Sequence, residues 1–273
     1  MATSTLTKSE TSKPVMPKSE KIKSTTDHHW NTRAKTIEND IEVNIMDVFQ
    51  REFEYDYVCK YLKPEMRILE VGCGNGFSTR KFRKLVAHVD AFDYSENMIE
   101  RAKATVGEKN NRFFQDNLLA PEHVRDTYDA VVCIRVLINI ERQKEALRNM
   151  IPWVKPGGLL ILVEGYTEGF ASLTQLRAKV GLPPVQPAKI NYYCPIADFT
   201  SELEKDLVLE HKFHLGSYDY LTRVLYPLVV GHDQAKHNTN FSEKCVELAR
   251  AFNADAFEEF SRIRGFVFRK NAA

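Results

Sequence analysis

Apolar and polar positions along the chain follow two patterns, short apolar runs and longer stretches in which apolar residues recur every three or four positions. The runs predict buried strands, and the wider spacing predicts amphipathic helices. Apolar runs, some of them interrupted by polar residues, predict strands at residues 68–71, 86–92, 112–115, 130–134, 159–163, 208–215 and 265–269. Helical spacing occurs between them, most clearly at residues 41–62, 95–106, 141–151 and 195–205. This alternation predicts an α/β fold with a doubly wound, mostly parallel sheet.

The first apolar run leads directly into three glycines at alternate positions, Gly72, Gly74 and Gly76. Because glycine has no Cβ atom, the backbone can adopt positive φ there and approach a ligand closely. Helical spacing then resumes, and the second run is followed by Asp93. An acid at the end of the second strand, roughly 20 residues past the glycines, is placed to accept from two ribose hydroxyls. The unit predicts a ligand that contains a nucleoside.

Dinucleotides and S-adenosylmethionine both suit such a unit, and the glycine spacing favours one of them. Dinucleotide loops read G-x-G-x-x-G, whereas this chain has G-x-G-x-G with Glu70 two positions before it. The stretch from Glu70 to Gly76 resembles motif I of class I S-adenosylmethionine-dependent methyltransferases. Later stretches resemble further motifs of that family in the same order: Asp93-Tyr94-Ser95 with Met98, Phe114 to Asn117, Tyr128 to Ile134, and Trp153 to Gly158 before Leu159 to Glu164.

The resemblance covers about residues 45–165 and implies a Rossmann-like methyltransferase fold whose seven-stranded sheet ends in an antiparallel strand. It also implies S-adenosyl-L-methionine as the cofactor; a domain of this fold that binds nothing is the alternative. The residues that the motifs assign to the cofactor are Glu70, Gly72, Cys73, Gly74, Gly76, Asp93, Tyr94, Met98, Asp116, Asn117 and Ile134. Arg33 is a further candidate, because a guanidinium can pair with the methionine carboxylate through two hydrogen bonds.

The ends of the chain depart from a minimal domain of this kind. Residues 1–26 are rich in Ser, Thr, Lys and Pro and predict a disordered basic tail, with a nucleic-acid tether as the alternative. Residues 27–273 are expected to form one domain. Its segments at about residues 165–197 and 216–262 are too long for ordinary connections and contain helical spacing, so we expect helical insertions that act as a lid.

The methyl acceptor is expected beyond the fourth and fifth strands, where Arg135, Glu164 and Tyr166 follow apolar runs. Trp30, in the cluster at residues 27–34, is expected to cover this place. Acceptors of high pKa need a base, and Glu164 is the candidate; its alternative role is an ion pair with Arg135. Arg135 itself either binds an acidic acceptor or is a solvated charge. No metal site is expected, because the adjacent histidines 28 and 29 lack a third nearby ligand.

Composition narrows the partners and the compartment. The 38 Lys and Arg residues nearly balance 37 Asp and Glu residues, so no overall field selects nucleic acid or a membrane surface. No apolar run approaches the roughly 20 residues that a spanning helix needs. The five cysteines are scattered without a C-x-x-C pair, which predicts reduced thiols and a cytoplasmic location.

The acceptor class follows from motifs that the sequence lacks. An N-P-P-Y or D-P-P-Y loop and a Pro-Cys nucleophile, which mark nucleic-acid base methylation, are absent after residue 134. We therefore expect methyl transfer to O or N of a small molecule, sugar or glycan precursor. Two alternatives stay open: a protein or RNA methyltransferase, and a non-catalytic methyltransferase-like subunit or S-adenosylmethionine sensor.

Overall fold

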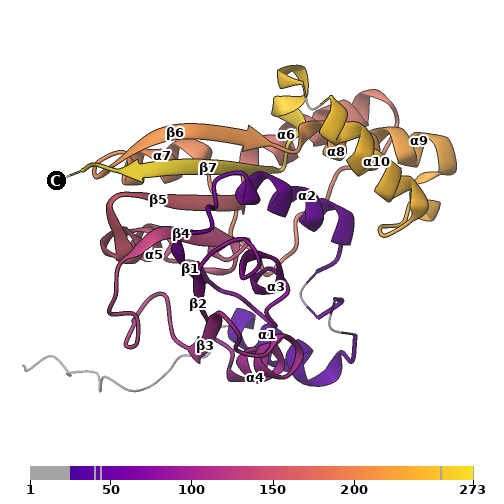
Figure 1. The fold of residues 1–273 in the computed structure, drawn as a ribbon. Helices are drawn as coiled ribbons and strands as arrows, with labels where there is room; N and C mark the ends of the chain where they lie inside the picture. Colours follow the sequence, from indigo (N-terminus) through magenta and orange to yellow (C-terminus); the bar gives the residue numbers. More distant parts are fainter. Residues whose placement is uncertain (1–24, 40, 44, 253, 273) are drawn as a thin grey trace, which may run out of the picture.

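The computed structural model describes residues 25–39, 41–43, 45–252 and 254–272, built around one seven-stranded sheet (Figure 1). The strand order is β3-β2-β1-β4-β5-β7-β6. The first five strands pair in parallel, whereas β7 is antiparallel to both β5 and β6. The expected fold class is confirmed. The expected tail, residues 1–26, lies outside the described residues except for its last two positions.

Every predicted strand is present within a few residues of its expected bounds, except that β5 begins five residues early. The strands are β1 (Arg67–Val71), β2 (His88–Asp93), β3 (Asn111–Gln115), β4 (Tyr128–Ile134), β5 (Val154–Gly165), β6 (Leu207–His214) and β7 (Ile263–Lys270). The longer helices are α1 (Thr25–Thr36), α2 (Val48–Cys59), α4 (Glu96–Val106), α5 (Gln143–Met150), α6 (Thr167–Lys179), α7 (Ile196–Leu203) and α10 (Asn240–Ala251). The short ones are α3 (Thr79–Phe82), η1 (Leu137–Asn139), η2 (Ile151–Trp153), α8 (Gly216–Tyr220), the π-helix η3 (Leu221–Leu225), α9 (Tyr226–Val230), η4 (His232–Gln234) and η5 (Asp255–Phe260).

The helix expected over residues 41–62 begins only at Val48. Asp47 stops it on the amino-terminal side, because its backbone is extended (φ −128°) and its carboxylate accepts from the Gln50 amide at 3.0 Å. An acid in this position satisfies an amide that has no partner within the helix. Val43 and Ile45 are buried all the same, so the apolar positions upstream of α2 pack without being helical.

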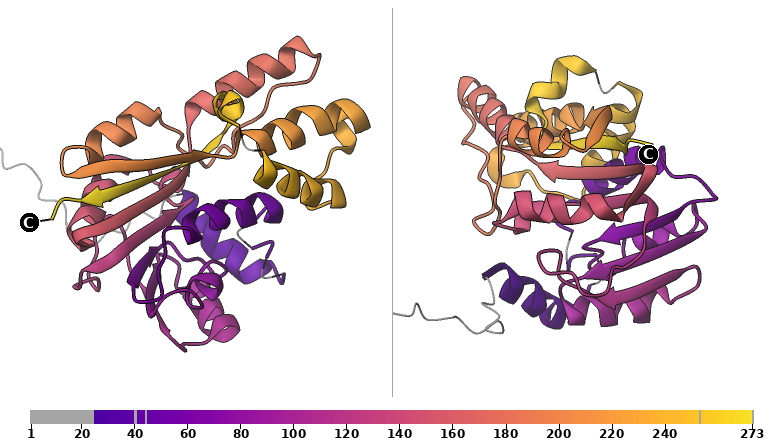
Figure 2. Two further views of the ribbon diagram at one scale, coloured as in Figure 1. Left: turned by 45° about the horizontal axis from the view of Figure 1, so that its top comes forward. Right: turned by 90° about the vertical axis from the view of Figure 1, so that its left-hand side faces the viewer.

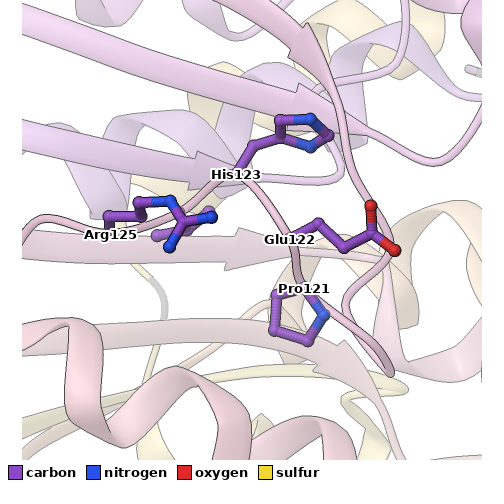
Figure 3. A pocket seen from close by; sticks show the side chains of 5 residues that line it. Pro121, Glu122, His123 and Arg125 are labelled. Atoms are coloured by element: carbon purple, nitrogen blue, oxygen red, sulfur yellow. The ribbon is translucent and has the colours of Figure 1, made fainter.

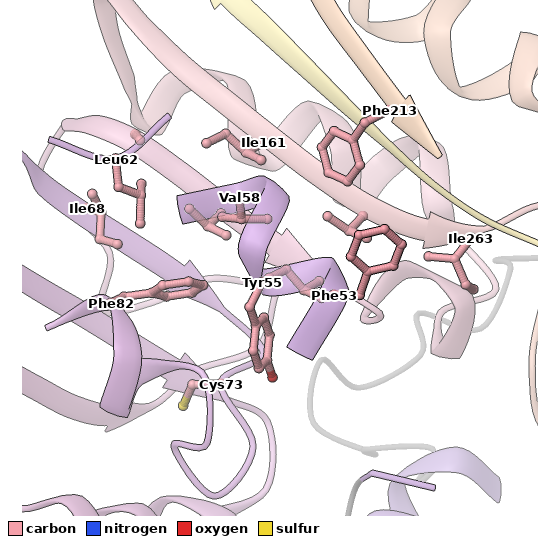
Figure 4. Packing of buried hydrophobic residues seen from close by; sticks show 14 of the residues in the cluster. Phe53, Tyr55, Val58, Leu62, Ile68, Cys73, Phe82, Ile161, Phe213 and Ile263 are labelled. Atoms are coloured by element: carbon pink, nitrogen blue, oxygen red, sulfur yellow. The ribbon is translucent and has the colours of Figure 1, made fainter. Parts of the chain in front are cut away.

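Helices cover both faces of the sheet, and each face has its own hydrophobic cluster. On one face, side chains of α2, α3, α4 and α10 pack on alternate strand positions such as Ile161 and Val163. Figure 4 shows part of this cluster, including Val58 of α2 and Ile161. On the other face, α5 and α7 pack on the intervening positions, such as Leu160 and Leu162. Burying each of these side chains stabilises the fold by roughly 1.5–3 kcal/mol. Because β5 is covered on both faces, its residues 159–163 are all apolar and form one continuous apolar run in the sequence.

The two insertions pack together beyond the ends of β5 and β6, where Figures 1 and 2 show α6, α8, α9 and α10 grouped. The first contains α6, which contacts η5 and η3 of the second. Glycines permit the closest approaches: a Cβ on Gly169 would lie 1.9 Å from the Ser261 carbonyl oxygen, and one on Gly216 would lie 1.8 Å from that of Phe257. Among the described helices, none is long and apolar enough to span a membrane.

Candidate cofactor and acceptor site

The glycine loop after β1 has a backbone that only glycine adopts readily. Gly72, Gly74 and Gly76 all have positive φ, at 68°, 54° and 78°. A Cβ on Gly72 would lie 2.3 Å from a methyl group of Val136, and one on Gly76 would lie 2.9 Å from a methyl group of Val106. The loop therefore packs directly on the segment after β4 and on α4. It lies at the carboxyl end of β1, where ligands of parallel sheets bind, and Gly72 is its partly exposed glycine.

Asp93, at the end of β2, holds this loop in place. Its Oδ2 accepts from the Gly74 amide at 2.8 Å, and its Oδ1 accepts from the Ser95 amide at 2.9 Å. Burial raises the pKa of Asp93, and the two amide hydrogen bonds oppose that rise. A carboxylate offers about four lone-pair sites, so two remain for donors such as ribose hydroxyls.

Glu70 and Cys73 lie beneath the loop. The Glu70 carboxyl is buried and accepts from the hydroxyls of Ser78 and Thr79, which ties the loop to the start of α3. Burial raises the pKa of Glu70 to about 7. The Cys73 side chain is buried in the core cluster next to α2 (Figure 4), and its amide donates to the Phe92 carbonyl at 2.9 Å. Both side chains support the loop, so any ligand contact of Cys73 is through its backbone.

Asp116 and Asn117, after β3, organise the next loop. Asp116 Oδ1 accepts from the amides of Asn117 and Glu122 at 2.8 and 2.9 Å, and its Oδ2 accepts from the His123 amide at 2.9 Å. Asn117 Oδ1 in turn accepts from the Leu119 amide at 3.0 Å. An open hollow lies in this loop, lined by the consecutive residues 121–125 (Figure 3). One segment alone forms it, and no residue of the glycine loop lines it.

The amino-terminal helix α1 packs on α4, beside the end of β2. Asn31 Oδ1 accepts from the Ser95 hydroxyl at 2.7 Å and from the Asn97 amide group at 3.1 Å. Trp30 packs in a small cluster whose buried members include Met98. This corrects two expectations. Met98 is 2% exposed beneath α1 and presents no side chain to a ligand, and Trp30 lies at α4 instead of meeting Arg135 beyond β4.

Arg33 also differs from its expected role. Its Nε donates to the Val43 carbonyl at 2.7 Å, and its Nη2 donates to the Glu42 carbonyl. These contacts fasten the segment after α1, so the guanidinium is not aimed at a cofactor carboxylate.

Tyr94 is half-buried, and its carbonyl accepts from the Gln115 side chain at 2.9 Å. Ile134 ends β4 as a core residue that is 9% exposed.

Glu164 does not fit the role of a general base. Its side chain is fully buried, and Oε1 accepts from the amides of Val136 and Leu137, both at 2.8 Å. Oε2 accepts from the Ile138 amide at 3.3 Å. Burial raises the pKa of Glu164 to about 7, against these hydrogen bonds and the charge of Arg135. The carboxyl therefore holds the turn η1 against the end of β5, and no acceptor can reach it in this arrangement.

Tyr166 is likewise buried away from any acceptor. It is 0% exposed and packs edge-on against Phe199 and Phe266, on the α5 and α7 face of the sheet. Its hydroxyl has no hydrogen-bond partner among the described residues. The sequence placed Tyr166 beside the acceptor because it follows β5, but its side chain points to the opposite face from α2.

Residues that the sequence did not single out surround Arg135. Glu54, on the buried side of α2, has one carboxyl oxygen 3.4 Å from Arg135 Nη1 and the other 3.5 Å from Arg51 Nε. Gln50 lies one turn earlier on α2 and is 5% exposed. The available signal was the pair of polar residues four positions apart, at 50 and 54, in line with Val58, which is fully buried.

A second set of charges joins α2 to the second insertion. Arg223 pairs with Asp47 at 2.7 Å, and Arg262 pairs with Asp219 at 2.6 Å. Gln50 Oε1 accepts from both arginines, at 3.3 and 3.2 Å. In this set each guanidinium has a close carboxylate partner, and Arg223 Nε also lies 4.0 Å from Asp219, so these contacts join the second insertion to the start of α2.

Comparison with known proteins agrees with this geometry. Residues 68–158 match the family model described as Methyltransferase domain. The chain is 30% identical over 110 residues to malonyl-(acyl-carrier protein) O-methyltransferase of Bacillus anthracis, covering 40% of each chain. It is 29% identical over 157 residues to the ubiquinone/menaquinone biosynthesis C-methyltransferase UbiE of Vibrio parahaemolyticus, covering 54% of this chain and 59% of that one. The chain thus spans about half the length of these curated relatives.

Solved structures with bound S-adenosylhomocysteine share the fold. Magnesium protoporphyrin IX methyltransferase of Synechocystis superposes with a TM-score of 0.56 at 17% identity, over 91% of this chain and 95% of that one. The N-methyltransferase NodS of Bradyrhizobium japonicum gives 0.53 at 14% identity, over 89% and 99%. With the glycine loop and the strand order described above, the chain carries over residues 68–158 a domain of the class I S-adenosylmethionine-dependent methyltransferase family.

Proposed function

We propose that the chain transfers a methyl group from S-adenosylmethionine to O or N of a small molecule, sugar or glycan precursor. One observation supports the cofactor: the glycine loop at the end of β1, with positive φ at all three glycines, is hydrogen-bonded through the Gly74 amide to Asp93 at the end of β2. Asp93 keeps acceptor capacity for two ribose hydroxyls. Dinucleotide loops have a wider glycine spacing than the one at residues 72–76.

The remaining cofactor contacts follow from position. The loop backbone from Gly72 to Gly76 takes the amino-acid end, and Asp116 with Asn117 takes the adenine end. When bound, S-adenosylmethionine supplies an electrophilic methyl group on a sulfonium. The chain's contribution is then to bind the acceptor in line with that methyl group and to exclude water.

The acceptor side lies at the ends of β4 and β5, beneath the insertions. Tyr192 returns from the first insertion and donates its amide to the Ile138 carbonyl at 2.6 Å, just after β4. The ring of Tyr193, the residue after Tyr192, lies against Gly165 at the end of β5. A Cβ on Gly165 would be 2.8 Å from that ring, so glycine permits this contact. The contacts of Tyr192 and Tyr193 with this place support a cover from the first insertion, and a covered site suits a small acceptor better than a polymer. The expected lid is thus part of the proposal.

The named relatives support a small acceptor. The enzymes similar to this chain include malonyl-(acyl-carrier protein) O-methyltransferase and methyltransferases of ubiquinone biosynthesis. The family model matches residues 68–158, around the proposed cofactor site, so it supports the reaction and leaves the acceptor to the insertions of this chain.

The test uses the full chain, methyl-labelled S-adenosylmethionine and a cell extract divided into small-molecule, protein and RNA fractions. The proposal expects label in the small-molecule fraction, lost when the product S-adenosylhomocysteine is added in excess. Label that enters only protein or RNA would support the alternative acceptors. Cofactor binding without transfer to any fraction, even when a partner-containing extract is added back, would favour the non-catalytic role.

A further inference from the structure

Two partly buried arginines beside the proposed acceptor site share a single carboxylate. Arg51 and Arg135 both contact Glu54, each through one nitrogen at 3.5 and 3.4 Å. Glu54 is the only carboxylate within 4.0 Å of either guanidinium among the described residues. These contacts are long for an ion pair, and neither is the two-bond pairing that a guanidinium and a carboxylate prefer.

Two other arginines of this region, each with a side chain that is 13% exposed, have closer carboxylate partners. Arg262 contacts Asp219 Oδ1 through Nε and Nη2, at 3.0 and 2.6 Å, and its own amide donates to Oδ2. Arg223 meets Asp47 at 2.7 Å. By contrast, Arg135 Nε is buried and has no hydrogen-bond partner among the described residues. A buried donor without a partner is costly, and more so on a charged group.

The charge balance around Arg135 also leaves room for an anion. Burial, and then repulsion from Arg51, lower the pKa of Arg135 against the attraction of Glu54. Glu164 is the other nearby acid, but three amides occupy its oxygens and its pKa is about 7. Glu54 balances one of the two guanidinium charges, and Glu164 therefore offsets only part of the other. A buried cation in excess is stabilised by an anion that pairs with it.

The backbone of Arg135 is held in an unusual conformation, which fixes the direction in which its side chain leaves the main chain. Its φ is +60°, in the left-handed region that a side chain of this size seldom occupies. Its amide donates to the Val163 carbonyl at 2.8 Å, and its carbonyl accepts from the Asn139 side chain at 2.9 Å. Strain of this kind persists where the surrounding structure enforces it, and such sites are often functional.

The position of Arg135 connects it to the proposed methyl donor. The next residue, Val136, packs directly on Gly72 of the glycine loop. The ring of Tyr193, from the first insertion, lies within electrostatic range of Arg135, and its hydroxyl is 3.0 Å from the Asn191 side chain. Figure 1 shows α2, which carries Arg51 and Glu54, between α3 and the helices of the second insertion.

From these observations we propose that the methyl acceptor is an acid whose carboxylate or phosphate binds Arg135 and Arg51. The inference rests on the proposed function and adds the acceptor's chemical class. The anion binds the guanidinium of Arg135, whose side chain is 21% exposed, and Glu54 continues to separate it from Arg51. The acidic group anchors the acceptor, and the atom that receives the methyl group lies closer to Gly72.

Direct binding tests the subsite. The full chain, saturated with S-adenosylhomocysteine, is titrated with malonate in one arm and inorganic phosphate in the other. We expect saturable binding of at least one anion, and the stronger arm identifies carboxylate or phosphate. Arg135→Gln should weaken it at least about tenfold through loss of a charged hydrogen bond. The matched control Arg142→Gln, on an arginine that is 62% exposed, should leave it unchanged.

Two results would overturn the inference: no saturable binding of either anion, or equal binding by Arg135→Gln when that variant is folded. If Arg135→Gln does not fold, Arg135→Lys takes its place; it keeps the charge but loses the fork of donors, so intermediate affinity is expected. Failure of S-adenosylhomocysteine itself to bind would instead reject the proposed function, which keeps the two failures distinct.

Activity gives a second readout. The small-molecule extract is separated on an anion exchanger before the labelled methyl assay. The inference expects acceptor activity in the retained fraction, with a higher apparent KM in Arg135→Gln and unchanged S-adenosylmethionine affinity. Acceptor activity confined to the unretained fraction would contradict it. So would a variant that only melts earlier, with the same KM per folded molecule.

Discussion

The substitution Glu164→Gln tests whether Glu164 has a structural role or acts as a catalytic base. The carboxyl is fully buried, and its pKa is raised from 4.5 to about 7 by burial. A raised pKa means that the folded state holds this proton more tightly than the unfolded state does. The group's contribution to stability is therefore complete below about pH 4.5 and is lost as the pH rises through about 7. The displacement corresponds to roughly 3 kcal/mol at about 1.36 kcal/mol per pKa unit.

Glutamine is nearly the shape of the protonated acid but cannot titrate. The difference in unfolding free energy between Glu164→Gln and the parent should therefore move in the variant's favour by up to about 3 kcal/mol between pH 5 and pH 8. Glu70 has a pKa raised in the same direction and remains in both proteins, so it cancels in the comparison. Urea denaturation at each pH measures the difference, and Glu141→Gln, at an exposed position, is the control that should show no such trend.

Turnover of the same variant completes the argument. If Glu164 only holds the turn after β4, methyl transfer per folded molecule should change little. A general base would instead lower turnover by roughly 10²–10⁴-fold when replaced. A loss of that size, together with a stability difference that does not vary with pH, would refute the structural role assigned here.

Three further substitutions test the site. Asp93→Ala should weaken S-adenosylmethionine binding by about 1.5–3 kcal/mol per lost charged hydrogen bond; calorimetry measures this, and Glu100→Ala, exposed on α4, should bind normally. Gly72→Ala should lower the free energy of unfolding by about 2–4 kcal/mol, combining the left-handed φ with the clash against Val136. Adding Val136→Ala should relieve the clash alone, and full recovery would argue against the backbone term. Trp30→Ala should lower the melting temperature without changing the acceptor's KM, and a raised KM would restore the covering role that the sequence predicted.

The sequence was sufficient for the strands, the glycine loop and Asp93. These features are local: an apolar run gives a buried strand, and glycines at alternate positions give a loop with positive φ. The position of Asp93 then follows from the strand length, because both strands end at the same edge of the sheet. The structure adds what no pattern could show, that Asp93 binds the loop through the Gly74 amide.

The residues of the acceptor side were harder to predict from the sequence, because position along the chain does not determine which way a side chain points. Glu164 lies near the end of β5 and Tyr166 directly follows that strand, yet Glu164 caps η1 and Tyr166 packs under α7. Arg135 was noticed as a charge after an apolar strand, but its partner Glu54 lies 81 residues earlier on a helix expected to be only amphipathic. Such pairs form through tertiary packing, so a single sequence carries little sign of them.

The glycine loop and Asp93 are expected to bind S-adenosylmethionine. Isothermal titration calorimetry of the full chain tests this expectation most directly, with S-adenosylmethionine, S-adenosylhomocysteine and NAD titrated in separate experiments under the same buffer. The structure predicts saturable binding of the first two with one site per chain and no binding of NAD. Tight binding of NAD without binding of S-adenosylmethionine would contradict the account.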